Sequence, residues 1–203
     1  MGFAKAANTG LACAQSDGFS WVLLLNDDAF LEPGAYESML SSIAPTIGVI
    51  GPVLYHQNKV QSAGIEVHKW GRIRNMQEHP ATAIYVDALC GACMMLPSWA
   101  RFNCDFPHGF EDVELCLRLG QQGLLSKLVP QARCQHQGGA SIDHLSPQKT
   151  EHSVYGHLRL LQRSGYVPIV TALAALQVLK EDKNIGRWKA IGKATQKWFY
   201  RNS

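Results

Sequence analysis

The stretch Trp21–Phe30, WVLLLNDDAF, contains the transition that decides the fold. Its first five residues are all apolar, which is typical of a short strand buried on both faces in an α/β protein. The run ends abruptly at Asn26, Asp27 and Asp28. Adjacent carboxylates repel each other, so their position directly after a buried strand needs a reason. Either they cap the next helix, or they hold a positively charged ligand.

Helix-like and strand-like segments alternate around this stretch. Residues 2–16 form a predicted helix that ends at Gly18 and has a face of small apolar residues, namely Ala6, Ala7, Leu11, Ala12 and Ala14. A second predicted helix begins around 30–34 and carries apolar residues at helical spacing, namely Tyr36, Met39, Leu40 and Ile43. The strand 47–50 follows. This alternation predicts an α/β fold with a mostly parallel sheet flanked by helices.

The rest of the chain continues with weaker patterns. Residues 53–84 are rich in polar residues and glycine, which predicts hairpins or loops. Residues 85–96 are apolar apart from Asp87 and Gly91. Further on, the patterns predict a helix that starts at 111, strands at 124–129 and 132–136, and helices at 153–162, 169–179 and 187–201.

Composition excludes several classes of protein. The chain has 203 residues, of which 46% are hydrophobic and 17% charged, which indicates a folded globular domain. The net charge of +3 is too small to demand a nucleic-acid partner. The first ten residues do not resemble a signal peptide, and no apolar run approaches the ~20 residues of a membrane span. The pair Cys90 and Cys93 has C-x-x-C spacing but no second pair follows, so a reduced, cytoplasmic compartment fits better than a metal or redox role.

Asn26, Asp27 and Asp28 are the first candidates for chemistry. In open α/β sheets, ligands bind beyond the carboxyl ends of the strands. Carboxylates at this edge can ligate a divalent cation, which in turn can hold a diphosphate. A helix cap needs only one such residue, whereas this stretch supplies three, which favours the ligand interpretation.

Glu111 and Asp112 form a second candidate pair, at the start of the predicted helix. Acidic residues are favoured there by the helix dipole alone. The functional alternative is a general base that takes a proton from an attacking hydroxyl. Glu114 lies one position too far round the helix to share that role.

Two further segments complete the set. His136 ends a predicted strand just before a glycine turn, in HQGGAS, where a histidine can orient a phosphate or complete a metal site; a structural histidine is the alternative. Gly91 interrupts the strand-like run VDALCGACMML, which indicates a bulge or a close approach of backbone, with a ligand as one candidate for the approaching group.

Taken in order, GFAKAANTG, LLLNDDA, VDALCGACMML, GFEDVELCLRLGQQG and HQGGAS resemble family 2 glycosyltransferases of the GT-A fold. The similarity is to the bacterial rhamnosyltransferase-like branch and covers roughly residues 2–164. The resemblance therefore implies a GT-A domain over 1–164, followed by a helical extension over 165–203.

The resemblance also implies roles for individual residues. Asn26, Asp27 and Asp28 match the DxD-type motif, with Asp28 as the ligand of Mg²⁺ or Mn²⁺ and His136 as a further metal residue. Asp112, with Glu111 beside it, matches the catalytic base. Residues that match positions facing the nucleotide and the donor sugar are Asn8, Gly91 and Ala92.

The implied activity is a hexosyl-type, inverting and metal-dependent transfer. The donor is a UDP- or dTDP-linked sugar, and the acceptor is a glycan or lipid-linked saccharide in bacterial cell-wall or polysaccharide biosynthesis. The expected location is the cytoplasm, with contact at the inner face of the membrane as an option for the basic helix 187–201. The other interpretation of that helix is packing on the domain, with a solvated basic face.

The chain departs from the family pattern at its start. It begins inside what matches the nucleotide-facing helix, so the preceding strands and the base-binding contacts are missing from the sequence. We therefore expect a fragment, a partner of a separate N-terminal segment, or a catalytically inactive relative. An aspartate-nucleophile phosphatase, which also places carboxylates after an apolar strand, fits poorly because Asn26 stands at the nucleophile position.

Overall fold

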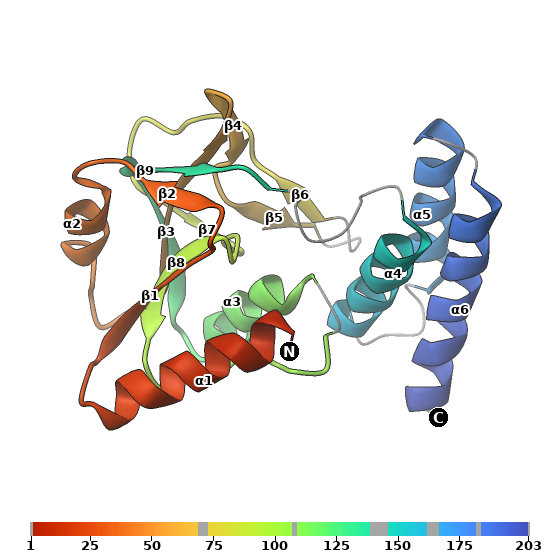
Figure 1. Cartoon of the computed structure of the whole chain (residues 1–203), viewed down its shortest axis with the longest axis horizontal. Helices are drawn as coiled ribbons and strands as arrows, with labels where there is room; N and C mark the ends of the chain where they lie inside the picture. The colour runs from red at the N-terminus through yellow and green to blue at the C-terminus, as the bar shows by residue number, and fades with distance from the viewer. Residues whose placement is uncertain are drawn as a thin grey trace. The chain divides into compact units, whose positions relative to one another are not determined.

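The computed structural model describes residues 2–68, 73–106, 109–138, 146–161, 167–181 and 184–202. These residues form two compact units. The first consists of residues 1–68, 72–103 and 112–138, and the second of residues 69–71, 104–111 and 139–203. Figure 1 labels the helices and strands of both units.

A seven-stranded sheet forms the centre of the first unit. Its main path runs in the order β1 (Trp21–Leu25), β8 (Cys93–Pro97), β3 (Ile47–His56), β9 (Leu125–His136) and β2 (Ala29–Leu31). Two strands lie off this path: β4 (Lys59–Ser62) pairs with β3, and β7 (Ile84–Val86) pairs with β9. A separate two-stranded sheet contains β5 (Ile65–Val67) and β6 (Ile73–Asn75). The described part of 53–84 thus forms hairpins and loops as predicted, except that the strand predicted at 47–50 continues to His56.

The α/β class is confirmed, but the sheet is mixed rather than mostly parallel. Among the strands that the structure describes, only β3 and β9 pair in parallel. The chain crosses from β1 to β3 without making them neighbours, and β8 fills the place between them in the antiparallel direction. The apolar segment predicted at 85–96 is therefore two strands, β7 and β8, separated by the loop 87–92.

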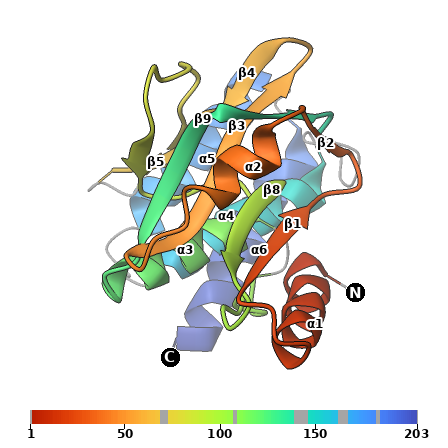
Figure 2. The same ribbon diagram turned by 90° about the vertical axis from the view of Figure 1, so that its left-hand side faces the viewer.

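Two helices cover opposite faces of this sheet, as Figures 1 and 2 show. The first, α2 (Ala35–Leu40), buries Ala35 and Met39 against Ile50 and Val129. On the other face, α3 (Glu111–Gln121) and the turn after it pack so closely that Gly48 of β3 has no room for a side chain. A Cβ there would lie 2.9 Å from Leu124 in the turn and 3.3 Å from Leu119 of α3.

The start of α2 differs from the prediction. Residues 29–31 form strand β2 instead of the first turn of a helix, and the helix begins only after Gly34, which has a φ of 80°. The apolar spacing of Tyr36 and Leu40 is misleading, since these side chains are 44% and 45% exposed. Pairing of 29–31 with β9 outweighs the local helical pattern.

Other predicted boundaries also shift. Helix α1 (Phe3–Ser16) ends before Gly18 as predicted, but it buries Ala4, Ala7 and Leu11, and the other small residues of the predicted face are not buried. The two strands predicted at 124–129 and 132–136 are one continuous strand, β9. The expected break survives as a register shift, because Val129 lies opposite Pro52 whereas Arg133 lies opposite Val53.

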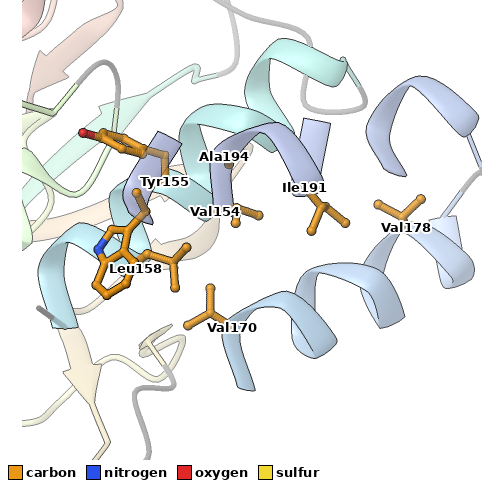
Figure 3. Packing of buried hydrophobic residues seen from close by; sticks show 8 residues of the cluster. Val154, Tyr155, Leu158, Val170, Val178, Ile191 and Ala194 are labelled. Carbon is orange, nitrogen blue, oxygen red and sulfur yellow. The ribbon is translucent and has the colours of Figure 1, made fainter. Parts of the chain in front are cut away.

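Three helices dominate the second unit: α4 (Pro147–Leu161), α5 (Val167–Glu181) and α6 (Ile185–Asn202). Their shared core, drawn in Figure 3, consists of Val154, Tyr155, Leu158, Val170, Val178, Ile191, Ala194 and Trp198. Because α4 packs with α5 and α6, the boundary predicted between 164 and 165 lies inside this unit. Helix α4 starts earlier than the predicted residue 153, since the Ser146 hydroxyl accepts a hydrogen bond from the Lys149 N–H and Pro147 suits the first turn.

Helix α6 packs on the other helices of its unit. Packing was one of the two alternatives expected for the basic helix 187–201. It buries Ala190, Ile191, Ala194 and Trp198, whereas Trp188 and Phe199 of the predicted apolar side remain 37% and 50% exposed. No helix in the part of the chain that the structure describes is long and apolar enough to cross a membrane.

The segment that precedes α3 has a strained backbone held by α4. Phe110 has a φ of 68°, a left-handed value that a bulky side chain rarely adopts. Its ring stacks on His157, with ring centroids 5.5 Å apart. A Cβ on Gly156 would lie 2.8 Å from the Phe110 ring and 3.2 Å from the Gly109 carbonyl oxygen. Gly156 therefore lets α4 approach this segment closely.

We expect Gly156→Ala to lower the free energy of unfolding by about 1–2 kcal/mol, because overpacking outweighs the gain in helix propensity. The matched control is Gly192→Ala on α6, where a Cβ meets nothing within 4 Å. This variant should be more stable than wild type by about 0.5–1 kcal/mol. Urea unfolding measures both, and equal effects of the two substitutions would contradict the packing of Phe110 on α4.

Candidate functional site

Asn26, Asp27 and Asp28 form a tight turn between β1 and β2. The Asn26 N–H donates to the Ala92 carbonyl at 2.9 Å, and the Asn26 carbonyl accepts from the Ala29 N–H at 3.1 Å. Since α2 begins only at Ala35 and its N-terminal residue Gly34 makes no side-chain capping bond, the turn does not cap a helix. Of the two explanations for the acidic pair, the helix cap is wrong.

The pairing of β2 with β9 brings Asp28 beside His136. Ala29 lies opposite His136 in the register. As a result, Asp28 Oδ1 is 3.3 Å from His136 Nε2, and Oδ2 accepts the Gly138 N–H at 3.1 Å. The Asp28 carbonyl accepts a further bond from the Gln137 N–H at 3.1 Å. The two residues predicted as metal ligands are therefore in contact.

Gln61 fixes the ring of His136 from the other side. Its amide oxygen lies 2.8 Å from His136 Nδ1. An amide oxygen only accepts hydrogen bonds, so the tautomer with its hydrogen on Nδ1 can donate to Gln61. In the neutral ring, the lone pair is then on Nε2, the nitrogen that faces Asp28. A hydrogen bond to the second ring nitrogen orients histidine ligands in the same way in many metal sites.

These residues fit a divalent cation that is shared with a substrate. Among the described residues there is no group of three or more His, Cys, Asp or Glu side chains placed to hold a metal. Two protein ligands are sufficient where phosphate oxygens supply the remaining positions, as in many nucleotide sites. A set of one carboxylate and one imidazole suits Mn²⁺ better than Mg²⁺, which prefers oxygen ligands. Asp27 is exposed beside this pair.

The loop 87–92 connects the acidic turn to Asp112. The Gly91 N–H donates to Asp112 Oδ2 and the Val113 N–H to Oδ1, both at 2.8 Å. These two bonds fix the orientation of the carboxylate. The close approach expected at Gly91 is made by protein, since a Cβ there would lie 3.3 Å from the Phe3 ring and 3.4 Å from Asp112 Cβ. Ala92 is 3% exposed and offers the site only its backbone.

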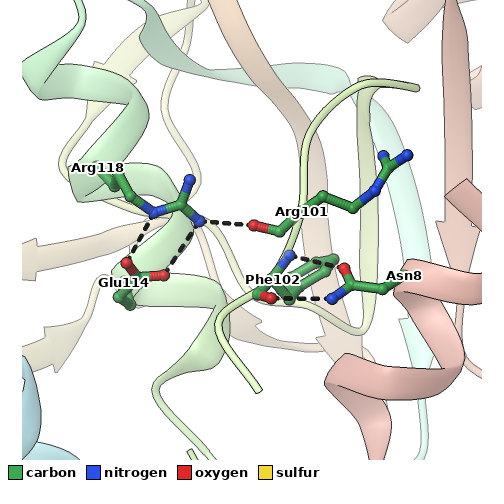
Figure 4. Close-up of polar contacts among 5 residues, drawn as sticks. All are labelled: Asn8, Arg101, Phe102, Glu114 and Arg118. Atoms are coloured by element: carbon green, nitrogen blue, oxygen red, sulfur yellow. Dashed lines mark hydrogen bonds and ion pairs between the residues drawn. The ribbon is translucent and has the colours of Figure 1, made fainter. Parts of the chain in front are cut away.

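The other acidic residues of α3 have different surroundings. Glu111, next to Asp112, is only 6% exposed. Glu114 forms an ion pair with Arg118 at 2.8 Å, and Arg118 also donates to the Arg101 carbonyl at 2.6 Å (Figure 4). This pairing agrees with the expectation that Glu114 does not share the role of Asp112.

Asn8 has a structural role that the sequence did not indicate. Its amide donates to the Phe102 carbonyl at 2.9 Å and its carbonyl accepts the Phe102 N–H at 2.7 Å (Figure 4). The side chain thereby imitates a strand partner and ties α1 to segment 101–103. The predicted contact with a nucleotide stays a prediction.

None of the six cysteines, all within the described residues, forms a disulfide, and those near the site are kept as thiols. Burial raises the pKa of Cys90 to about 12, and the negative charge of Asp112 adds to the effect. Burial likewise raises the pKa of Cys116 to about 12. The Cys93 thiol donates a hydrogen bond to Cys134, which raises the pKa of Cys93 and lowers that of Cys134. A thiolate at Cys90 is therefore disfavoured, against a metal or redox role for C-x-x-C.

Comparisons with known proteins concern the family and the fold. Residues 1–97, a little under half of the chain, match the family model for glycosyl transferase family 2. The resemblance to family 2 is thereby confirmed over these residues, and not over the whole expected range of 2–164. The GT-A fold expected of such proteins is also confirmed. The crystal structure of GalNAc-T7 with UDP, GalNAc and Mn²⁺ superposes with a TM-score of 0.56 over 79% of this chain.

The structural likeness concerns the fold alone, because the identity is 13%. The chain spans about a third of the length of GalNAc-T7, with 34% of that protein covered. A search of curated proteins found no match.

Gln61 was not predicted as a site residue, because no motif or spacing in the sequence around it indicates a contact with His136. Its position next to His136 depends on the β3–β4 hairpin and on Gly138, whose φ is 64° and where a Cβ would lie 2.9 Å from the Gln61 amide nitrogen. The last residues of HQGGAS, 139–141, lie outside the described residues.

We expect Asn8→Ala to cost about 1–3 kcal/mol of folding free energy, since it leaves the Phe102 N–H and carbonyl without their partner. Thr9→Ala is the control, because its hydroxyl bonds only to the Lys5 carbonyl on the exposed side of α1, and it should change stability by less than about 0.5 kcal/mol. Denaturant unfolding compares the two. Full stability of Asn8→Ala would contradict the structural role.

Proposed function

We propose that this protein is a metal-dependent, inverting hexosyltransferase that moves a sugar from a UDP- or dTDP-linked donor to a glycan or lipid-linked acceptor. The observation that carries the proposal is the contact of Asp28 with His136 at the end of β1 and β9, in a GT-A fold. The UDP and Mn²⁺ of the GalNAc-T7 structure support it, because a nucleotide and a cation occupy a protein of the same fold.

Asp112 is the proposed base. Its carboxylate takes the proton of the acceptor hydroxyl as that oxygen attacks the anomeric carbon, and the bond from this carbon to the diphosphate breaks on the opposite face. The N–H groups of Gly91 and Val113 hold the carboxylate in one orientation while this happens. Glu111, the buried residue before it in α3, is proposed to support this role.

Asp28 and His136 are the residues that would hold the cation, with Asn26 and Asp27 beside them at the turn. When bound, Mn²⁺ or Mg²⁺ would offset the negative charge of the departing nucleoside diphosphate. Asn8, Gly91 and Ala92 are proposed to face the nucleotide and donor sugar, the last two through their backbone.

The proposed setting is the bacterial cytoplasm, in polysaccharide or cell-wall synthesis. Contact with an anionic membrane surface would use the basic side of α6. On this side, Lys193 pairs with Glu151 at 2.9 Å and Lys197 lies 4.7 Å from the centre of the Tyr155 ring, so both also serve the packing of the helical unit.

Calorimetry with UDP and dTDP tests the nucleotide and metal parts. We expect saturable binding heat that depends on Mn²⁺ and disappears with a chelator. Asp28→Asn keeps an acceptor for the Gly138 N–H but removes the charge, and should weaken binding at least about tenfold, as should His136→Ala. Asp17→Asn, an exposed carboxylate at the end of α1, is the control and should bind as wild type. No metal-dependent heat with either nucleotide would favour an inactive relative or one that needs a separate segment.

Asp112→Ala tests the base. With a donor that binds, we expect kcat to fall by about 10²–10⁴ while nucleotide affinity stays unchanged, because the base acts on the acceptor hydroxyl. Glu114→Gln, a carboxylate on the same helix that faces Arg118, should transfer at nearly the wild-type rate. Unchanged turnover of Asp112→Ala in a folded protein would remove it from the proposed role.

A further inference from the structure

A polar cavity of about 610 Å³ opens beside the Asp28–His136 pair. Its polar lining residues are His56, Gln57, Lys59, Gln61, Gln77 and Gln137. Four of these six are glutamines and none is acidic. We refer to this cavity as the glutamine pocket.

Three of the four amides are available to a ligand. Within the part of the chain that the structure describes, the side chains of Gln57, Gln77 and Gln137 make no hydrogen bond, whereas Gln61 is engaged by His136. An amide offers both a donor and an acceptor, which matches neighbouring hydroxyl groups on a sugar ring. Lys59 and His56 add donors. Together with the apolar Val60, these groups offer hydrogen-bonding partners and a contact surface that match a polyhydroxylated ring.

The glutamine pocket is connected to the candidate metal ligands by direct contacts. Gln61 reaches from the pocket to His136 Nδ1, and the N–H of Gln137 donates to the Asp28 carbonyl. His56 Nδ1 lies 3.3 Å from the His136 carbonyl oxygen. A ligand in the pocket would thus lie on the Nδ1 side of the His136 ring, whereas Nε2 faces Asp28.

Gln77 belongs to a segment that backbone bonds hold against the hairpin. The neighbouring Met76 exchanges hydrogen bonds with Ala63 and Gly64 at 2.7 and 2.9 Å. These bonds bring Gln77 to the same cavity as Gln57 and Gln61, although it lies well beyond them in the chain.

The backbone at the rim of the pocket is strained. The turn between β3 and β4 consists of Gln57 and Asn58, with φ values of 48° and 63°. Such two-residue turns strongly prefer Asn, Asp and Gly, and Asn58 tolerates the left-handed conformation. Glutamine has no such preference, so a smaller residue would serve the turn better at position 57. The presence of glutamine at this strained position points to use of its side chain.

We propose that the glutamine pocket binds a pyranose ring of the substrate, next to Asp28 and His136, and selects which saccharide takes part in transfer. The placement of that saccharide beside the reacting groups rests on the proposed function. The binding of a sugar to the pocket does not, and it is tested without nucleotide or metal.

The test compares Gln57→Gly with Asn58→Gly. Both substitutions relieve the left-handed strain, so both should raise the midpoint of thermal unfolding. Only the first removes a side chain that lines the pocket. Saturation-transfer NMR with methyl glycosides of glucose, galactose, N-acetylglucosamine and rhamnose should show at least one that binds wild type and Asn58→Gly equally. Gln57→Gly and Gln77→Ala should each bind it about three- to tenfold more weakly.

Competition separates the two sources of the sugar. If the pocket holds the donor sugar, the UDP- or dTDP-linked form of the bound sugar displaces the methyl glycoside; if it holds the acceptor, the methyl glycoside remains bound. Either result supports the subsite. Equal binding by Gln57→Gly and Asn58→Gly, or no glycoside bound by wild type, would overturn it. If only the metal-dependent heat of nucleotide binding is absent, this counts against the transferase proposal. The result on sugar binding by the pocket is then unaffected.

Discussion

The backbone pairing of β2 with the end of β9 is the interaction on which the candidate site depends. Three residues, 29–31, pair with 134–136, and the register places Ala29 opposite His136. This pairing converts two adjacent carboxylates, which would otherwise repel each other in solvent, into one exposed group and one group held by the Gly138 N–H and the His136 ring. The Asp28 carbonyl bond to Gln137 continues the same contact beyond the strand.

The loop 87–92 links the acidic turn to Asp112 through hydrogen bonds of its backbone. Strand β8 inserts between β1 and β3, and its preceding loop accepts the Asn26 N–H at Ala92 and donates from Gly91 to Asp112. The acidic turn and the proposed base are therefore fixed by a single stretch of backbone. The thiols of Cys90, within that stretch, and of Cys116 stay neutral, because burial raises the pKa of both to about 12.

The side-chain carboxamides of Asn8 and Gln61 have different roles, although the chemical group is the same. Asn8 uses both of its ends on the Phe102 backbone, so its amide contributes to the fold. Gln61 uses its oxygen on His136, and the side chains of Gln57, Gln77 and Gln137 make no hydrogen bond within the described residues. The difference follows from position: Asn8 is on a helix packed on the domain, whereas the glutamines line a cavity close to His136.

The sequence by itself determined the elements whose signals are local. The apolar run before Asn26, the helix with Asp112 in its first turn, the close approach at Gly91 and the helical C-terminal region all follow from periodicity or from glycine. The family motifs likewise identified Asp28, Asp112 and His136 as candidates. Only the tertiary structure decided that residues 29–31 are a strand, that β8 runs antiparallel to its neighbours, and that Gln61 contacts His136. Each of these depends on pairing between segments far apart in the chain. The free energy of that pairing comes from backbone bonds and shared burial, which leave no local pattern in the residues themselves.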